Sequence, residues 1–350
     1  MRKYKVLCIA FSVLFFMGCK EEKEKLFIYN WGDYMDMDVV HQFEKDEGIQ
    51  IVYQEFASNE DLYVKIQNSN DQIDLIFPSD YMIERMKKDN LLKKIDLSKI
   101  PNYKYIDERF RHLDYDPDDE YSVPYFWGTV GIVYNAEKYP EGLDSWSDLW
   151  DEKYKKDIVL YNSQRDVLMV ALKKLGYSMN VTDENILEEA KYELLKQKPL
   201  VYAYLGDEIK DILVMEDANI GMVYSGDASV IISENEKYKY SIPKEGTNIW
   251  FDAVAIPKNS KNIEMAHKFI NYLCDPKIAA MNAEYLQYAT PETEAKKYLP
   301  PEMENDKALF PEISNLKNCE IFSDPSKYLK RYDRIWTEFQ SGYNKSQKSE

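Results

Sequence analysis

Short apolar runs alternate with amphipathic segments in the first part of the chain. Residues 26–29 and 49–53 are apolar runs typical of buried strands, and segment 36–48 between them carries apolar side chains at helical spacing before a closing glycine. The same pairing of helix and strand returns in 58–66 and 73–77. The order strand, helix, strand, helix, strand predicts a parallel sheet with helices on both of its faces.

The later part of the chain continues this alternation after a segment without a clear period. Residues 91–120 mix charged residues, prolines and tyrosines and are interpreted as a surface connection. The β-branched and aromatic run 122–134 is long enough to cross between two lobes, and 201–224 has the pattern strand, helix, strand. Segment 328–339 has apolar residues at helical spacing and is interpreted as a packed helix. A chain of 350 residues is too long for one compact core, so we expect two lobes.

The first residues have the pattern of an export signal. A basic head in 2–5 precedes the apolar run 6–16, which is too short to span a bilayer, and a small residue stands before Cys19. This predicts a lipoprotein signal peptide at 1–18, lipidation of Cys19 and a tether at 19–25, which would anchor the protein at the periplasmic face of a bacterial membrane. A signal-anchor helix is the alternative, and the short apolar run disfavours it.

Charge and composition narrow the possible partners. The formal net charge is −17, and such a chain repels nucleic acid and attracts cations, although solubility alone also explains an acidic surface. Only Cys274 and Cys319 could pair, because the other two cysteines belong to the leader or carry the lipid. The three histidines are far apart in sequence, so we expect neither a metal ion nor a cofactor.

Groups that combine aromatic residues, a small residue and a carboxylate recur at the predicted ends of strands. These groups lie at 29–34, 77–81, 161–166, 224–227 and 249–252, with a further aromatic loop at 287–291. Ligands of open α/β sheets bind at strand ends, and aromatic rings around a carboxylate suit an organic cation. The same rings could instead close the edge of a hydrophobic core.

The acids in these groups differ in how well a structural role explains them. Asp80 could cap the helix that follows it, and Asp166 could be a first-turn charge of another helix. Asp252 lies inside an otherwise apolar strand, where a carboxylate is unfavourable unless it meets solvent in a cleft or a cationic partner.

With these residues in view, the mature chain resembles the periplasmic polyamine-binding proteins of ABC importers, the spermidine/putrescine-binding family. The resemblance is carried, in order, by YNWGDY (29–34), PSDY (78–81), SVPYFWG (122–128), LGYS (175–178), PKEG (243–246), WFD (250–252) and AIP (255–257). It implies an α/β fold, namely a two-lobed, type II-like periplasmic binding protein in which each lobe is a sheet flanked by helices and two crossing strands join the lobes. The implied lobes are 26–127 plus 255–302 and 128–254 plus 303–350.

The resemblance also implies a function. The protein would capture polyamines, spermidine or putrescine or both, between its lobes and deliver them to the permease subunits of an ABC transporter. It would not be an enzyme, would not bind nucleic acid, would touch the membrane only through its lipid, and is expected to be a monomer. The family places Cys274 in the first lobe and Cys319 in a tail on the second, so both thiols would stay free.

The resemblance assigns roles to individual side chains. The rings implied to lie along the methylenes and ammonium groups of the ligand are Trp31, Tyr34, Tyr81, Trp250 and Tyr288. Ser79 would hydrogen-bond an amine, Asp252 would pair an internal or distal nitrogen, and Asp166 a terminal one. Two positions depart from the family. Ser163 stands where spermidine binders have an aspartate, and Tyr224 where they have a tryptophan, so the preferred length and amine number of the ligand stay open.

Two other kinds of function compete with polyamine binding. Ferric iron or another small cation could bind to clustered tyrosines in the same fold, but iron favours adjacent tyrosines with a nearby histidine or carboxylate, and no Tyr-Tyr pair occurs. A hydrolase could use carboxylates such as Asp166 and Asp252. The sequence contains no nucleophile elbow, metal triad or phosphate-binding loop, so we predict no catalytic residues.

Overall fold

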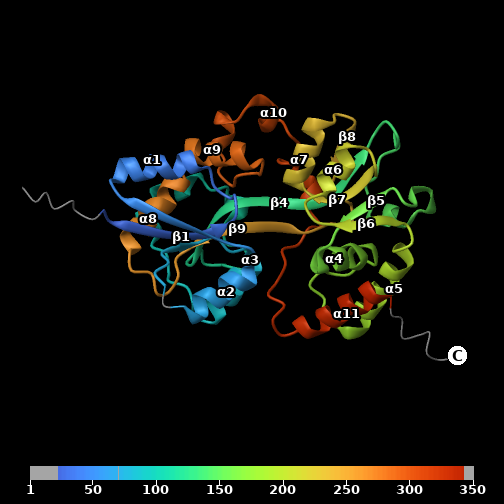
Figure 1. Ribbon diagram of the computed structural model, residues 1–350, viewed down its shortest axis with the longest axis horizontal. Coiled ribbons are helices and arrows are strands. Elements are labelled where there is room, and N and C mark those ends of the chain that lie inside the picture. Colours follow the sequence, from blue (N-terminus) through green and yellow to red (C-terminus); the bar gives the residue numbers. More distant parts are fainter. Residues whose placement is uncertain (1–22, 70, 343–350) are drawn as a thin grey trace, which may run out of the picture.

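The computed structural model describes residues 23–69 and 71–342, and it has two lobes side by side (Figure 1). Strands β4 (Ser122–Asn135) and β9 (Ile249–Ala255) run from one lobe into the other, as Figure 1 shows. This confirms the predicted two-lobed α/β architecture with two crossing strands. The predicted signal peptide and Cys19 lie outside the described residues.

The first lobe is built on the predicted parallel sheet. Strand β1 (Lys25–Trp31) lies between β2 (Gln50–Phe56) and the short β3 (Leu75–Ile76) and pairs with both in parallel. The helices of this lobe are α1 (Met37–Glu47), α2 (Asn59–Asn68), α3 (Asp80–Lys88), α8 (Ile263–Leu273), α9 (Pro276–Leu286) and α10 (Pro301–Glu304). The parallel order arises because each strand is followed by a helix that returns the chain to the same end of the sheet.

The second lobe repeats this arrangement. Its strands are β5 (Ile158–Tyr161), β6 (Val201–Leu205), β7 (Ile220–Tyr224) and β8 (Tyr238–Ser241), and its helices are α4 (Gln164–Lys174), α5 (Glu184–Gln197), α6 (Ile209–Val214), α7 (Ser225–Glu234) and α11 (Leu329–Ser341). The strand order through both lobes is β2-β1-β3-β9-β4-β7-β5-β6, with β8 paired to β4. Helix α11 buries Tyr332, Ile335 and Phe339 against the second lobe, so the predicted packed tail is confirmed.

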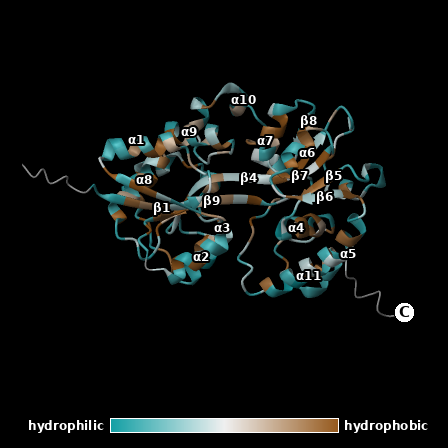
Figure 2. Cartoon of the chain, viewed as in Figure 1, coloured by the Kyte–Doolittle hydropathy of each residue, from teal (hydrophilic) through white to brown (hydrophobic). Residues whose placement is uncertain are grey.

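Each lobe has its own hydrophobic core. One cluster of buried side chains gathers around β1, β3 and β9, and the other around β5, β7 and α4. Figure 2 shows apolar residues on the strands and inner helix faces and polar residues on the outer faces of α1 and α2. No helix within the described residues combines the length and apolar character that a bilayer crossing requires.

The interpretation of 91–120 as a surface connection is wrong. Short 3-10 turns, among them Pro101–Tyr105 and Glu108–Phe110, bring apolar side chains of this segment into the core of the first lobe. The Phe110 ring lies 4.6 Å from that of Trp127 and 5.2 Å from that of Phe251, measured between ring centroids. Turns of this kind have no regular apolar period, which explains why the pattern did not reveal the packing.

The crossing strands β4 and β9 pair with each other, and Gly128 of β4 leaves room for the side chain of Trp250. The register runs from Ser122 opposite Ala255 to Thr129 opposite Ile249, with an irregularity after Pro124. A β-carbon at Gly128 would stand 2.5 Å from the Trp250 ring, so only glycine leaves room for that ring on β4.

Candidate functional site

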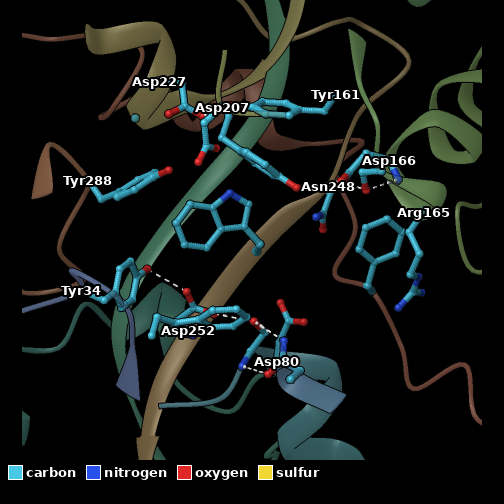
Figure 3. Close-up of a pocket in the computed structure, with 18 of the residues that line it drawn as sticks. Tyr34, Asp80, Tyr161, Arg165, Asp166, Asp207, Asp227, Asn248, Asp252 and Tyr288 are labelled. Atoms are coloured by element: carbon cyan, nitrogen blue, oxygen red, sulfur yellow. Dashed lines mark hydrogen bonds between the residues drawn. The ribbon is translucent and has the colours of Figure 1, made fainter. Parts of the chain in front are cut away.

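A cleft of about 1020 Å³ opens between the lobes, and residues of both lobes line it. It lies where β1, β7 and β9 end or cross, which is the place where open α/β sheets bind ligands. The sequence-predicted site residues that line it are Trp31, Tyr34, Ser79, Tyr81, Ser163, Asp166, Tyr224, Trp250, Asp252 and Tyr288. The fold therefore brings all ten into one cavity, several of which Figure 3 shows at close range.

Asp252 is held on the first-lobe side of the cleft by two hydroxyl groups. The Tyr34 hydroxyl donates to Asp252 Oδ2 at 2.7 Å, and Ser79 Oγ donates to Asp252 Oδ1 at 2.6 Å. The side-chain amide of Asn59 donates in turn to Ser79 Oγ at 3.0 Å, which orients the serine. Asp252 is only 8% exposed, and burial raises the pKa of its carboxyl, while the two hydroxyl hydrogen bonds oppose this shift. The arrangement leaves a buried carboxylate directed at the cleft (Figure 3).

Asp80 serves neither as a side-chain cap nor as an exposed cleft acid. Helix α3 begins after Ser79, which makes no side-chain capping bond. Asp80 is 2% exposed, and its carboxylate accepts hydrogen bonds from the backbone N–H of Phe251 at 3.0 Å and of Tyr81 at 2.6 Å. Burial raises the pKa of Asp80 to about 7. Asp80 thus connects the start of α3 to the crossing strand β9 by a hydrogen bond, and it is one of the residues that line the cleft.

Asp166 stands on the second-lobe side and is held by both residues that depart from the family pattern. Ser163 Oγ donates to Asp166 Oδ2 at 2.6 Å, and the Tyr224 hydroxyl donates to the same oxygen at 2.8 Å. Asp166 is 4% exposed, and burial raises the pKa of its carboxyl. Its other oxygen, Oδ1, is buried without a hydrogen-bond partner in the described part of the chain. A free acceptor on a buried carboxylate is where a ligand N–H would bind.

A third carboxylate of the cleft, Asp227, is partly compensated by the protein. The Tyr161 hydroxyl donates to Asp227 Oδ2 at 2.7 Å, and Lys210 Nζ lies 3.4 Å from Oδ1. Asp207 lines the same cavity and is exposed to solvent. The sequence analysis gave no ligand role to Tyr161, Lys210 or Asp207. Tyr161 ends β5 and Asp207 follows β6 by two residues, so the pattern of strand ends could have marked both, while Lys210 lies within α6.

Aromatic rings from both lobes surround these acids. Trp250 and Tyr288 meet edge to face with ring centroids 5.3 Å apart, and Tyr34 lies 6.4 Å from Tyr288. The Tyr288 ring packs on Gly226 of α7, where a β-carbon would come within 2.3 Å of it. Ring faces beside carboxylates form an environment suited to ammonium groups linked by methylenes.

A second cation besides Lys210, Arg165, also lines the cleft, and it was not anticipated. The Arg165 guanidinium stacks over the Phe322 ring at 3.9 Å and lies 5.6 Å from the centre of the Tyr81 ring. Burial lowers the pKa of Arg165. With Lys210 it offsets part of the negative charge of the aspartates that line the cleft, among them Asp166, Asp227 and Asp252. No cluster of histidine, cysteine and acidic side chains able to hold a metal ion occurs among residues 23–69 and 71–342.

Two α/β lobes joined by crossing strands, with an aromatic and acidic cleft between them, define a solute-binding protein of the two-lobed class. The chain belongs to the bacterial extracellular solute-binding protein family, whose model matches residues 38–311. Membership fits the absence of catalytic motifs from the sequence, since proteins of this class bind a solute without transforming it.

Individual relatives cover nearly the whole chain. The spermidine/putrescine-binding periplasmic protein of Escherichia coli is 36% identical over 92% of this chain and 93% of its own length. A putative spermidine/putrescine ABC transporter structure from Listeria monocytogenes is 44% identical, with a TM-score of 0.82 over 91% of this chain and 99% of that one. A spermidine/putrescine ABC transporter substrate-binding protein from Streptococcus pneumoniae is 40% identical, with a TM-score of 0.84 and the same coverage.

Proposed function

We propose that the protein captures a linear polyamine, spermidine or putrescine, between its lobes and delivers it to the permease of an ABC importer. The observation that carries this proposal is the pair of buried carboxylates, Asp252 and Asp166, on opposite sides of one aromatic cleft. A flexible chain with an ammonium group at each end matches such a pair, and the names of the relatives point to the same ligand class.

Each ligand contact would contribute a modest free energy, and their sum reaches useful affinity. An ammonium group over a ring such as that of Trp250 contributes about 0.5 to 2 kcal/mol, and a charge-assisted hydrogen bond to Asp166 or Asp252 about 1.5 to 3 kcal/mol. Several such contacts reach the roughly 8 kcal/mol that corresponds to a micromolar Kd. The remaining predicted contacts are Trp31, Tyr34, Ser79, Tyr81, Ser163, Tyr224 and Tyr288.

The cellular setting belongs to the same proposal. Lipidation of Cys19 after removal of residues 1–18 would hold a monomeric binding protein at the periplasmic face of a bacterial membrane, through the tether 19–25. The lobes would move as the units 26–127 plus 255–302 and 128–254 plus 303–350, which close on the ligand by bending at the crossing strands. Asp252 lies on the crossing strand β9 itself, where Tyr34 and Ser79 hold it to the first lobe.

Ferric iron is the poorer ligand for this cleft. Iron would bind tyrosine as the phenolate, but burial and the neighbouring Asp252 raise the pKa of the Tyr34 hydroxyl. The pKa of Tyr288 is raised by burial and by Asp227. Both hydroxyls are therefore kept protonated, which favours hydrogen bonding over metal coordination.

Calorimetry on the unlipidated protein, from residue 23 onward, tests the proposal. Putrescine, spermidine, spermine and ferric citrate are titrated separately at neutral pH. At least one polyamine should bind with micromolar affinity or better, while ferric citrate should give no saturable heat. A protein that binds none of the three polyamines below millimolar concentration refutes the proposal.

A further inference from the structure

Asn248 is a cleft residue that the family resemblance does not single out. It is 4% exposed and lines the cavity directly before β9. Its side-chain oxygen Oδ1 is buried and has no hydrogen-bond partner among the residues that the structure describes. Asp166 Oδ1 is in the same condition, and both residues line the same cavity. Asn248 lies near the helix that carries Asp166, because Thr247 Oγ1 is 3.8 Å from Met169 Sδ of α4. Figure 3 draws the two side chains on the same side of the cleft.

The backbone of Asn248 is fixed on both sides, so the side chain is held toward the cavity. Its carbonyl oxygen accepts a hydrogen bond from the Val130 N–H of β4 at 3.2 Å, and Asn248 forms a parallel bridge with Glu320. A buried acceptor without a partner opposes folding, and leucine would fill nearly the same volume without that penalty. A polar side chain at this position is therefore explained by a hydrogen bond that the unliganded chain does not make.

We propose that Asn248 Oδ1 and Asp166 Oδ1 together form one subsite for a primary ammonium group of the ligand. The proposal rests on the polyamine function argued above. A primary ammonium carries three N–H donors on one nitrogen, so it satisfies both oxygens at once, with charge pairing from Asp166 and a second hydrogen bond from Asn248. Where spermidine binders have a second acid, this chain has Ser163, whose hydroxyl is directed to Asp166. The neutral acceptor Asn248, directly before β9, takes over part of the role of that acid.

Arg165 is the competing partner for the Asn248 oxygen. Its Nε and Nη1 are buried without acceptors in the described residues, so these donors could turn toward Asn248. The guanidinium is instead stacked on Phe322 at 3.9 Å, and its Nη2 lies 3.4 Å from Asn180 Oδ1. The two alternatives differ in when Asn248 and Asp166 are coupled. A shared ammonium couples them only when the ligand is bound, whereas Arg165, which interacts electrostatically with Asp166, would couple them in the unliganded protein as well.

A double-mutant cycle on Asn248 and Asp166, with putrescine affinity measured by calorimetry, tests whether a ligand ammonium or Arg165 is the partner of Asn248 Oδ1. Asn248→Leu should weaken putrescine binding roughly tenfold to a hundredfold, the loss expected for one hydrogen bond to a charged group. In an Asp166→Asn background the same change should weaken binding by less than about threefold, because the ammonium is no longer held there. Asn248→Asp should strengthen binding in the parent. Asn185→Leu, on an exposed position of α5, is the control and should change nothing.

Folding is checked in the same set of proteins. Unliganded Asn248→Leu should melt at or above the temperature of the parent, since it removes an unpaired acceptor. The proposed subsite is overturned if Asn248→Leu binds putrescine as tightly as the parent. It is also overturned if Asn248→Leu weakens binding equally in the parent and in the Asp166→Asn background. A lower melting temperature without ligand would identify Arg165 or another protein group as the partner and overturns it as well. Failure of the parent itself to bind any polyamine would instead refute the proposed function.

Discussion

Replacing Asp252 by asparagine should weaken polyamine binding more than any other change of a single acid. The carboxylate is 8% exposed and already accepts hydrogen bonds from Tyr34 and Ser79, so its charge has little water to stabilise it in a closed cleft. Asparagine keeps the size and one acceptor but removes the charge that pairs with the ligand nitrogen. We expect a loss of about 2 to 4 kcal/mol, or roughly 30-fold to 900-fold in Kd.

The unliganded fold should not share this loss. Burial raises the pKa of Asp252, which means that the ionised side chain is less favourable in the folded protein than in the unfolded chain. Asp252→Asn should therefore melt at the same temperature as the parent or higher.

Calorimetry with spermidine and putrescine measures the loss, and Asp33→Asn is the matched control. Asp33 is an exposed acid on the rim of the same cleft, and it accepts a hydrogen bond from the Tyr285 hydroxyl at 2.6 Å. Its neutralisation should change Kd by less than about threefold, since exposed charges are screened. An Asp252→Asn protein that binds spermidine as tightly as the parent would show that the acid is structural and that this reasoning is wrong.

Four further predictions concern the pH dependence of affinity and of stability, the ligand length and the thiols. Burial raises the pKa values of the ligand-binding acids Asp252 and Asp166, so polyamine affinity should rise as the pH rises from acid towards neutral. Calorimetry in buffers of different ionisation enthalpy should show that protons are released on binding. The folded pKa of Asp80, about 7, lies above its unfolded value. Its contribution to the free energy of unfolding is therefore present at acid pH and is lost as the pH rises through about 7. Asp80→Asn should flatten this part of the plot of unfolding free energy against pH. Putrescine should bind within about tenfold of spermidine, and Ser163→Asp should shift the preference toward spermidine; a thousandfold spermidine preference in the parent would contradict the role given to Ser163. Thiol titration in denaturant without reductant, on protein from residue 23 onward, should find Cys274 and Cys319 both free, and a result of no thiol would contradict their placement in separate lobes.

The local pattern of the sequence was sufficient for the architecture of the lobes. The apolar runs and the helical spacing between them specify β1, α1, β2, α2 and β3, because strand-helix-strand units close in parallel with one handedness. The grouping of rings with acids at strand ends marked segments that line one cleft, because the ends of parallel strands meet at the same edge of a sheet. The family resemblance singled out ten side chains within these segments, and all ten line the cleft. Where the backbone lacks a regular period, as in 91–120, the pattern carried no information about burial, and the packing was misjudged.

Only the tertiary structure decided which partners each acid has. Tyr224 and Ser163 are far apart in sequence, yet their hydroxyls meet on one oxygen of Asp166, and Tyr161 reaches Asp227 in the same way. Asn248 has no sequence feature that marks it, and it becomes a candidate only because its oxygen is buried beside a cavity without a partner. Burial and hydrogen bonding depend on atoms that the folding of each lobe brings together from distant parts of the chain. The sequence determined which residue types stand at the strand ends, while the packing of the lobes across β4 and β9 determined which of their polar atoms are satisfied by the protein and which remain open to a ligand.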